Sequence, residues 1–571
     1  MARWVCSYGI THEATGALLK ILKNVELDEL RNLPLDPRTL LGTPKSTIIR
    51  SVPPGEYFHY GLKNALLDQL KIIDIDRIST NIQININIDG LPIAKSSKSQ
   101  LYPILGEMYP KIAEPFVIGA YHGNEKPNSC NTFLREFIDE YNVLHQSGFY
   151  YCNQKFTITI RAVICDSPAR SFVTCTKSHN GYFGCGKCRE EGNYNNHRML
   201  FLNSNAALRI DENFIQRIDE EHHFGTSPFE ETGLGMVSQF PLDYMHLICL
   251  GVVKKILQTF THGSHKQKFS AKMIKEISAN LKTIAKWIPS EFARKTRELE
   301  NLDRWKATEL RLFLLYVGPV ALQNYLPKKY LIHFISLHCA IRILCHETDC
   351  KRNNKYAKDL LNYFVEKCIE LFGTNFLIYN THNLIHLADD VLKFGHLDSF
   401  SAFSFESYLY NIKKKLKKAE KPLQQLHNRI VEHVACNLKK KIIFFEKPKV
   451  MCKNNKKSEE LGIASYNTIH YNKFTLSTIN KADQFCYLQD DTIVRVKNIC
   501  LNNDNPILIG ESLINPIGFP NYPIDSKEFD IVIGNQWSHS TNFDANNVTR
   551  KAVCIPYKKS YCFLPLLHSY N

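Results

Sequence analysis

Three acidic residues could together bind divalent cations. Asp89 and Asp166 each end an apolar run typical of a buried strand, in NIQININIDG and RAVICD. A carboxylate there needs a cation or hydrogen-bond donors to compensate its charge, although an Asp that starts a turn is the common alternative. Glu406 lies in the aromatic run FSAFSFESYLY, which predicts the start of a helix. Together the carboxylates could hold two Mg²⁺ or Mn²⁺ ions roughly 4 Å apart and catalyse in-line phosphoryl transfer.

Lysines that follow Glu406 suit a phosphodiester substrate. If the helix continues, Lys413 and Lys417 lie on the same face as Glu406, and Lys414 lies beside them. We expect these three lysines to contact the DNA backbone. The alternative is an ordinary amphipathic helix whose charged face is solvated.

Cys185 and Cys188, in GYFGCGKCREEG, are the one Cys-x-x-Cys pair among the 18 cysteines. A structural zinc site needs four ligands, so the pair alone is equally compatible with a tight turn and two buried thiols. His382 and His386, in HNLIH, would point from one helical face and complete the site. Taken alone, histidines at this spacing are more often ordinary helix-face residues. The two pairs together predict one structural zinc ion.

A competing set of zinc ligands lies in CHETDC. It contains Cys345, His346 and Cys350, and no second pair in the sequence complements it. We therefore expect this set to be incidental.

The first third of the chain predicts the strands that carry the two Asp residues. Residues 1–75 are expected to be helical and loop-rich, with breaks at LPLDPRTLLGTP and SVPPGEY. The alternation from 81 to 89 predicts a strand with four Ile residues on one face and polar residues on the other. QLYPILGEM and EPFVIGAYHG predict two more strands, CNTFLREFIDEYNVLH a helix, and RAVICD a fourth strand. Residues 76–190 are thus expected to form three strands, a helix and a strand.

The remaining chain is expected to change character several times. Residues 191–380 have helical spacing, as in MIKEISANLKTIAKWI and LLNYFVEKCIELF. Residues 381–440 predict a helical pair with the two histidines and Glu406, and 441–460 a polar basic linker. From 461 to 571, short strands separated by Asn, Asp, Gly and Pro turns predict a small β-barrel or sandwich.

Composition limits the class of protein. The chain has 571 residues, 44% of them hydrophobic, and should form roughly two to four domains. Its 18 cysteines are too sparse for a disulfide-stapled protein, which favours a reduced, intracellular one. We find no signal peptide and no stretch apolar enough to span a membrane, so we expect a soluble protein. The net charge of +15 favours a polyanionic partner, although a solvated basic surface explains it nearly as well.

The order of these parts resembles a known family of enzymes. Two strand-borne Asp residues, a Cys-x-x-Cys pair, a long helical insertion, a His-x-x-x-His pair and a helix-borne Glu resemble the catalytic core of eukaryotic cut-and-paste DNA transposases of the CACTA and Chapaev type. The V(D)J recombinase core shares this plan. Strings within residues 75–435 are also similar to this class, among them IDGLPIAKSSKSQLYPILG, YHGNEKPNS, CDSPARSFVTCTKSHNGYFGCGKC, LDYMHLICLGVVKKIL and FSFESYLYNIKKKLKK. The implied fold class is α/β: an RNase H-like mixed sheet interrupted by a large all-helical insertion, with a small C-terminal all-β domain.

The resemblance implies roles for individual residues. Three acids would bind the two Mg²⁺ or Mn²⁺ ions: Asp89, Asp166 and Glu406. Four residues would form one zinc site: Cys185, Cys188, His382 and His386. The D-x-x-H element of LDYMH picks out Asp243 and places His246 near the active site, where the residues alone would indicate a core or capping histidine. His122 and Lys126 in YHGNEKP are candidate substrate contacts, and a structural loop is the equal alternative.

The implied activity is DNA transposition in the nucleus. Metal-dependent cleavage at transposon ends would precede attack of the freed 3′-hydroxyl on target DNA. The partner would be double-stranded DNA and not a membrane, and the chain could act as a homodimer. Transposases of this kind usually carry a separate module that reads the transposon ends, and no ligand set for one precedes Asp89.

That departure leaves several alternatives open. The chain could be a shortened copy, or an enzyme whose DNA-binding element has another form. It could also be a host-recruited DNA-binding or chromatin protein that has no catalytic turnover. A metal-dependent nuclease acting on RNA is a further alternative, because the same acids can cleave either backbone.

Overall fold

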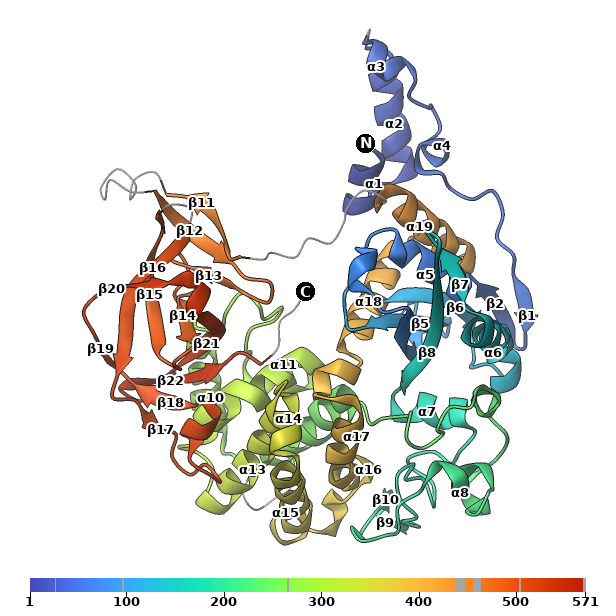
Figure 1. Ribbon diagram of the computed structural model, residues 1–571. Helices are drawn as coiled ribbons and strands as arrows, with labels where there is room; N and C mark the ends of the chain where they lie inside the picture. The colour runs from blue at the N-terminus through green and yellow to red at the C-terminus, as the bar shows by residue number, and fades with distance from the viewer. Residues whose placement is uncertain are drawn as a thin grey trace. The chain divides into compact units, whose positions relative to one another are not determined.

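The computed structural model describes residues 1–25, 27–94, 97–263, 266, 268–437, 447–454, 464–502 and 505–567 (Figure 1). The chain divides into two compact units. The first contains Met1–Gly192, Asn205–Asp243 and Ser399–Ile443, and the second contains Asn193–Ser204, Tyr244–Asp398 and Phe444–Asn571. Within the described ranges, no helix is both long and apolar enough to cross a membrane.

A mixed sheet forms the centre of the first unit. Its strands run in the order β1-β2-β6-β5-β3-β8-β7, and β4 pairs with β5. β3 and β8 are parallel, whereas the other neighbours are antiparallel. The strands are β1 (Arg50–Val52), β2 (Gly55–His59), β3 (Asn81–Ile88), β4 (Leu91–Pro92), β5 (Gln100–Tyr109), β6 (Phe116–Gly123), β7 (Phe149–Tyr151) and β8 (Gln154–Ile164).

The helices of this unit include two that cover opposite faces of the sheet, α6 and α18 (Figure 1). The N-cap Ser129 starts α6 by accepting a hydrogen bond from the Thr132 N–H at 3.2 Å. The helices are α1 (Ala2–Tyr8), α2 (His12–Lys23), α3 (Asp28–Arg31), α4 (Pro37–Leu41), α5 (Leu62–Leu70), α6 (Cys130–Ser147), α7 (Ser167–Thr174), α8 (Asp211–Ile215), α18 (Phe403–Lys415) and α19 (Pro422–Asn437).

The two faces of β3 differ in chemistry. The four Ile residues of β3 lie in one apolar core with residues of α5 and α6. The other face is polar, as the alternation predicts, yet Asn85 and Asn87 on it are at most 2% exposed. A strand buried on both faces must pair its polar side chains internally. The Asn87 amide nitrogen does so by donating to the Ile164 carbonyl at 2.8 Å, whereas its Oδ1 has no hydrogen-bond partner among the described residues.

The expected order of three strands, a helix and a strand is confirmed by β3, β5, β6, α6 and β8. The region before it differs from the expectation. SVPPGEY, predicted to be a break, forms the β1–β2 hairpin, and β2 pairs with β6. Pro53 and Pro54 occupy the turn between the paired residues Val52 and Gly55, where their lack of an N–H donor costs no ladder bond.

Helices dominate the middle part of the second unit, as predicted. Residues 245–261 begin with the π-helical segment η4 and continue as α9. The main elements are η4 (Met245–Val253), α9 (Lys254–Thr261), α10 (Ala271–Ala285), α11 (Ala307–Leu312), α12 (Gly318–Leu322), α13 (Lys328–Cys345), α14 (Asp349–Arg352), α15 (Asn354–Phe372), α16 (Tyr379–His382), η8 (Asn383–His386) and α17 (Leu387–Phe394).

The C-terminal part of the second unit is all-β, which confirms that prediction. Among the described residues of this part, twelve strands form one antiparallel sheet whose main path runs β11-β12-β15-β14-β21-β22-β18-β17. β11 (Lys449–Lys453) pairs with β12 (Ser465–His470), so part of the expected linker 441–460 is a strand. Residues 441–446 and 455–460 of that linker lie outside the described residues. The other strands on this path are β14 (Phe485–Leu488), β15 (Ile493–Asn502), β17 (Ile517–Gly518), β18 (Val532–Gly534), β21 (Val548–Tyr557) and β22 (Ser560–Pro565).

A buried ion cluster ties the helical part of this unit to the sheet. Lys551 of β21 is fully buried, and its Nζ lies 2.6 Å from a carboxylate oxygen of both Glu291 and Asp483. The ammonium also donates to the Thr475 carbonyl at 2.6 Å. All three donors of the lysine are thereby used, as a buried charge requires.

We expect Lys551→Met to lower the melting temperature of the chain strongly. The substitution leaves two buried carboxylates without their cation, a loss of about 3–5 kcal/mol. Lys473→Met is the matched control, because it breaks an ion pair with Glu347 in which both side chains are more than half exposed, worth about 1 kcal/mol or less. Scanning calorimetry measures both, and equal effects would contradict the role of the cluster.

Candidate metal centre

Asp89 and Asp166 follow two neighbouring parallel strands at one edge of the sheet. Asn87 of β3 pairs with Ile164 of β8, and each Asp lies two residues further along. Both carboxylates act on Tyr102: burial raises the pKa of its hydroxyl, and the charges of Asp89 and Asp166 raise it further. The two acids therefore follow the same end of neighbouring strands, and both act on Tyr102.

Local hydrogen bonds orient both carboxylates. Asp89 Oδ1 accepts from the Gly90 N–H at 2.6 Å. Asp166 is the N-cap of α7, and its Oδ1 accepts from the Ala169 N–H at 2.7 Å, with Pro168 in the first turn. The turn-starting role of Asp166 is therefore real. It is compatible with cation binding, because a carboxylate has several acceptor positions.

Glu406 comes from the first turn of α18, more than 300 residues after Asp89. Ligand atoms of Asp89, Glu406 and His246 all lie within 4.8 Å of one another, and each residue is partly exposed. Asp166 is outside this group. Two oxygens on opposite sides of one Mg²⁺ are about 4.2 Å apart, so small side-chain rotations would let Asp89 and Glu406 share a cation.

A polar cluster on the polar face of β3 binds the segment that leads into α18. Arg161 of β8 donates from Nη1 to Asn85 Oδ1 at 3.1 Å and to the Ser399 carbonyl at 3.2 Å. Asn85 Nδ2 donates to the same carbonyl at 3.2 Å. The guanidinium stacks on Tyr109, 3.8 Å from the ring centroid. Asn85 and Arg161 belong to β3 and β8, the strands that precede Asp89 and Asp166. The cluster therefore connects these two strands to the segment that precedes Glu406.

The three lysines predicted to contact DNA have different surroundings. Lys413 donates to the Pro92 carbonyl, and the Lys414 ammonium lies 4.4 Å from the centroid of the Tyr410 ring. Lys417 is exposed beyond the end of α18, and its backbone N–H donates to Gln425 Oε1 at 3.0 Å. The expected helical stripe from Glu406 to Lys417 is therefore wrong, because α18 ends at Lys415 and residues 416–421 turn into α19.

His122 and Lys126, the other candidate substrate contacts, lie at the end of β6 and after it. A ring nitrogen of His122 lies 2.8 Å from the Ser99 hydroxyl, and Lys126 is exposed. Two residues beside the acids had no role in the sequence prediction. Tyr102 is one of them. His179 is the other, since the charge of Asp166 acts on its ring. Burial lowers the pKa of His179, and this effect outweighs the opposing effect of Asp166.

The predicted zinc ligands form one buried group. Ligand atoms of Cys185, Cys188, His382 and His386 all lie within 4.8 Å of one another. The Cys188 thiol lies 3.5 Å from the Cys185 sulfur, close to the roughly 3.8 Å that separates two thiolates on tetrahedral zinc. His386 Nε2 is buried and has no hydrogen-bond partner among the described residues, which fits a metal ligand. The group could bind zinc.

The backbone around the two histidines differs from the expectation. His382 ends α16, and His386 ends the 3₁₀ segment η8, so no continuous α-helix carries both. Their ring centroids are nevertheless 5.4 Å apart. The competing set in CHETDC does not form a metal-sized group in the described parts of the chain. There the Cys350 thiol donates to the Glu347 carbonyl at 3.5 Å.

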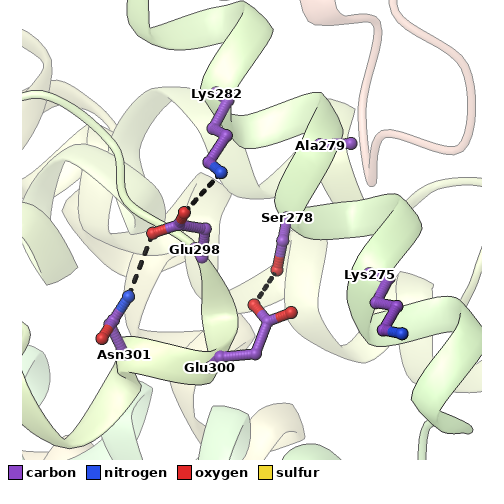
Figure 2. Close-up of a pocket in the computed structure, with 7 residues that line it drawn as sticks. All are labelled: Lys275, Ser278, Ala279, Lys282, Glu298, Glu300 and Asn301. Carbon is purple, nitrogen blue, oxygen red and sulfur yellow. Dashed lines mark hydrogen bonds and ion pairs between the residues drawn. The ribbon is translucent and has the colours of Figure 1, made fainter.

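A surface pocket in the second unit is unrelated to these residues. It lies beside α10 and is bridged by two interactions, Lys282 with Glu298 at 2.6 Å and Ser278 with Glu300 (Figure 2). Asn301 also donates to Glu298 at 3.0 Å, so most of its polar groups are paired with each other, and none of the candidate catalytic or zinc residues lines it. Its lining consists of Lys275, Ser278, Ala279, Lys282, Glu298, Glu300 and Asn301.

Comparisons with known proteins concern the C-terminal part. A family model described as a domain of unknown function, DUF8592, matches residues 446–566. This is about a fifth of the chain and corresponds to the all-β sheet from β11 to β22. No curated protein matches the chain. The match carries no function with it.

We expect the purified chain to contain about one zinc ion per molecule. Cys185→Ser should lose the ion and lower the melting temperature, because structural zinc contributes folding free energy. Cys350→Ser is the matched control: its thiol is also fully buried but outside the group, and the zinc should remain. Elemental analysis of each variant measures the ratio, and a metal-free wild type of equal stability would contradict the prediction.

Proposed function

We propose that the chain is a DNA transposase of the RNase H-like class that performs metal-dependent phosphoryl transfer with Asp89, Asp166 and Glu406. The observation that carries the proposal is the approach of Asp89 and Glu406 to within 4.8 Å. Two carboxylates this close repel each other, and a cation bound between them would offset that repulsion. Asp166, at the end of the neighbouring strand, supplies the third acid.

The sheet order supports the RNase H-like assignment. The resemblance implies three strands, a helix and a fourth strand that carry the first two acids. In the sheet, β3, β5 and β6 form an antiparallel meander, α6 follows, and β8 returns parallel to β3. The helical stretch from η4 to α17 then separates Asp166 from Glu406, as the implied insertion does.

The residues divide the chemistry between them. Two divalent cations, when bound, would activate a water or a 3′-hydroxyl and stabilise the leaving oxygen. Asp89 and Asp166 present carboxylates that backbone N–H groups have already oriented, which reduces the reorganisation needed at the site. Glu406 would close the ligand set from α18. The exposed Lys414 and Lys417 would bind backbone phosphates of the DNA.

The zinc group would have a structural role in this proposal. Its four buried ligands would fill the tetrahedral coordination of zinc and leave no open position for a substrate. This is typical of a structural site. Cys185 and Cys188 follow the segment of Asp166 and α7, and His382 and His386 precede that of Glu406. Zinc would thereby restrain both ends of the helical insertion. We further propose a nuclear location and assembly as a homodimer on DNA ends.

We expect Asp89→Asn to abolish Mg²⁺- or Mn²⁺-dependent nicking of supercoiled plasmid DNA. The loss should be at least about a hundredfold, because metal-bound carboxylates account for several kcal/mol of transition-state stabilisation. Asp28→Asn is the control, since its side chain is 88% exposed and belongs to α3. Circular dichroism verifies that each variant is folded.

The same assay separates the enzyme from a host-recruited binding protein. A wild type that binds DNA but shows no metal-dependent nicking and no Mn²⁺ binding by calorimetry would favour the binding protein. Full nicking by folded Asp89→Asn would refute the assignment of the acids. Cleavage restricted to RNA substrates would favour the nuclease alternative.

A further inference from the structure

Asp243 is buried against the first turn of α18. It is 4% exposed, and its Oδ1 accepts a hydrogen bond from the Ala402 N–H at 2.9 Å. The first N–H groups of a helix have no acceptor within the helix, and the N-cap residue Ala402 has no side-chain oxygen that could cap it. The carboxylate of Asp243 instead accepts from the N–H of the N-cap residue itself, and its charge suits the positive end of the helix dipole.

Ala402 connects Asp243 to Glu406 through one further hydrogen bond. The Ala402 carbonyl accepts from the backbone N–H of Glu406 at 2.9 Å. Ala402 is therefore bonded to Asp243 through its N–H and to Glu406 through its carbonyl. It thus helps to set the backbone position of Glu406, one turn later. Any shift of Ala402 would move Glu406 relative to Asp89.

Adjacent contacts restrain the same segment. The Ser401 hydroxyl accepts from the Phe403 N–H at 3.1 Å, in the turn that Asp243 caps. Tyr244 donates to Asp398 Oδ1 at 3.0 Å. The consecutive residues Asp243 and Tyr244 are thus hydrogen-bonded to Ala402 and Asp398, respectively. Asp243 itself is absent from the metal-sized groups that the described residues form.

We infer that Asp243 is a positioning residue that holds Ala402, and through it Glu406, where Asp89 and Glu406 can share a divalent cation. The inference rests on the proposed function, because the cation belongs to that proposal. Asp243 does not coordinate the cation; it orients a ligand. Removing a group of this kind typically weakens metal binding by about 10- to 100-fold.

Mn²⁺ titration of the full chain by calorimetry tests this role. Asp243→Ala should weaken Mn²⁺ binding by about tenfold or more. Asp243→Asn keeps an amide oxygen that can accept the Ala402 N–H, and its affinity should stay within about threefold of the wild type. Ser129→Ala is the matched control: it removes a cap hydrogen bond of the same kind from α6 and should lower stability without changing the affinity.

The outcomes distinguish the inference from the proposed function. Wild-type affinity in folded Asp243→Ala overturns the inference alone, as does equal weakening in Asp243→Ala and Asp243→Asn. If Asp243→Ala does not fold, Asp243→Glu keeps the charge but displaces the carboxylate by one methylene; weakened binding is expected, and unchanged binding overturns the inference. A wild type that binds no Mn²⁺, or binding that Asp89→Asn leaves intact, overturns the proposed function and the inference with it.

Discussion

Arg161 places a partly buried positive charge in the first unit, where it contacts both the sheet and the segment that enters α18. Burial lowers the pKa of its guanidinium, yet an arginine keeps its charge, so its donors must be satisfied where it lies. Asn85 Oδ1 and the Ser399 carbonyl accept from it, and the Tyr109 ring covers its face. A buried donor without an acceptor costs about 1–3 kcal/mol, more when charged. This requirement fixes Ser399 against the two strands that carry Asp89 and Asp166.

The polar face of β3 therefore also restricts how the segment before α18 packs on the sheet. An apolar face would pack against α18 in several registers of similar energy, whereas Asn85 and Arg161 have few arrangements that satisfy all their hydrogen bonds. Lys111, which is exposed, adds contacts to the buried Glu107 at 3.3 Å and to the Ser404 hydroxyl at 3.4 Å. The second unit uses the same physics at Lys551, whose carboxylate partners come from the helical part and from the sheet. In both units buried polar groups determine how separate segments meet.

Asp166 and Asp243 illustrate one relation between stability and chemistry. Each carboxylate accepts from a backbone N–H at a helix start, Asp166 for α7 and Asp243 for α18. The first is partly exposed and follows β8 beside the end of β3, and the second is buried. The same local interaction thus occurs on a partly exposed acid and on a buried one, and only the first could also contact a cation. Burial and position in the fold, and not residue type, separate the two roles.

The strands β3, β5, β6 and β8 and the helix α6 followed from the sequence, because alternation and helical spacing are properties of a few consecutive residues. The four residues of the Cys2His2 group were also evident, whereas only the resemblance indicated His246, which lies with Asp89 and Glu406. The β1–β2 hairpin, the strand β11 and the break after Lys415 were not, since each depends on pairing with a distant segment. The approach of Glu406 to Asp89 and the bond from Ala402 to Asp243 were decided only in the tertiary structure. They depend on which buried donors and acceptors satisfy one another across hundreds of residues, and no local pattern encodes that choice.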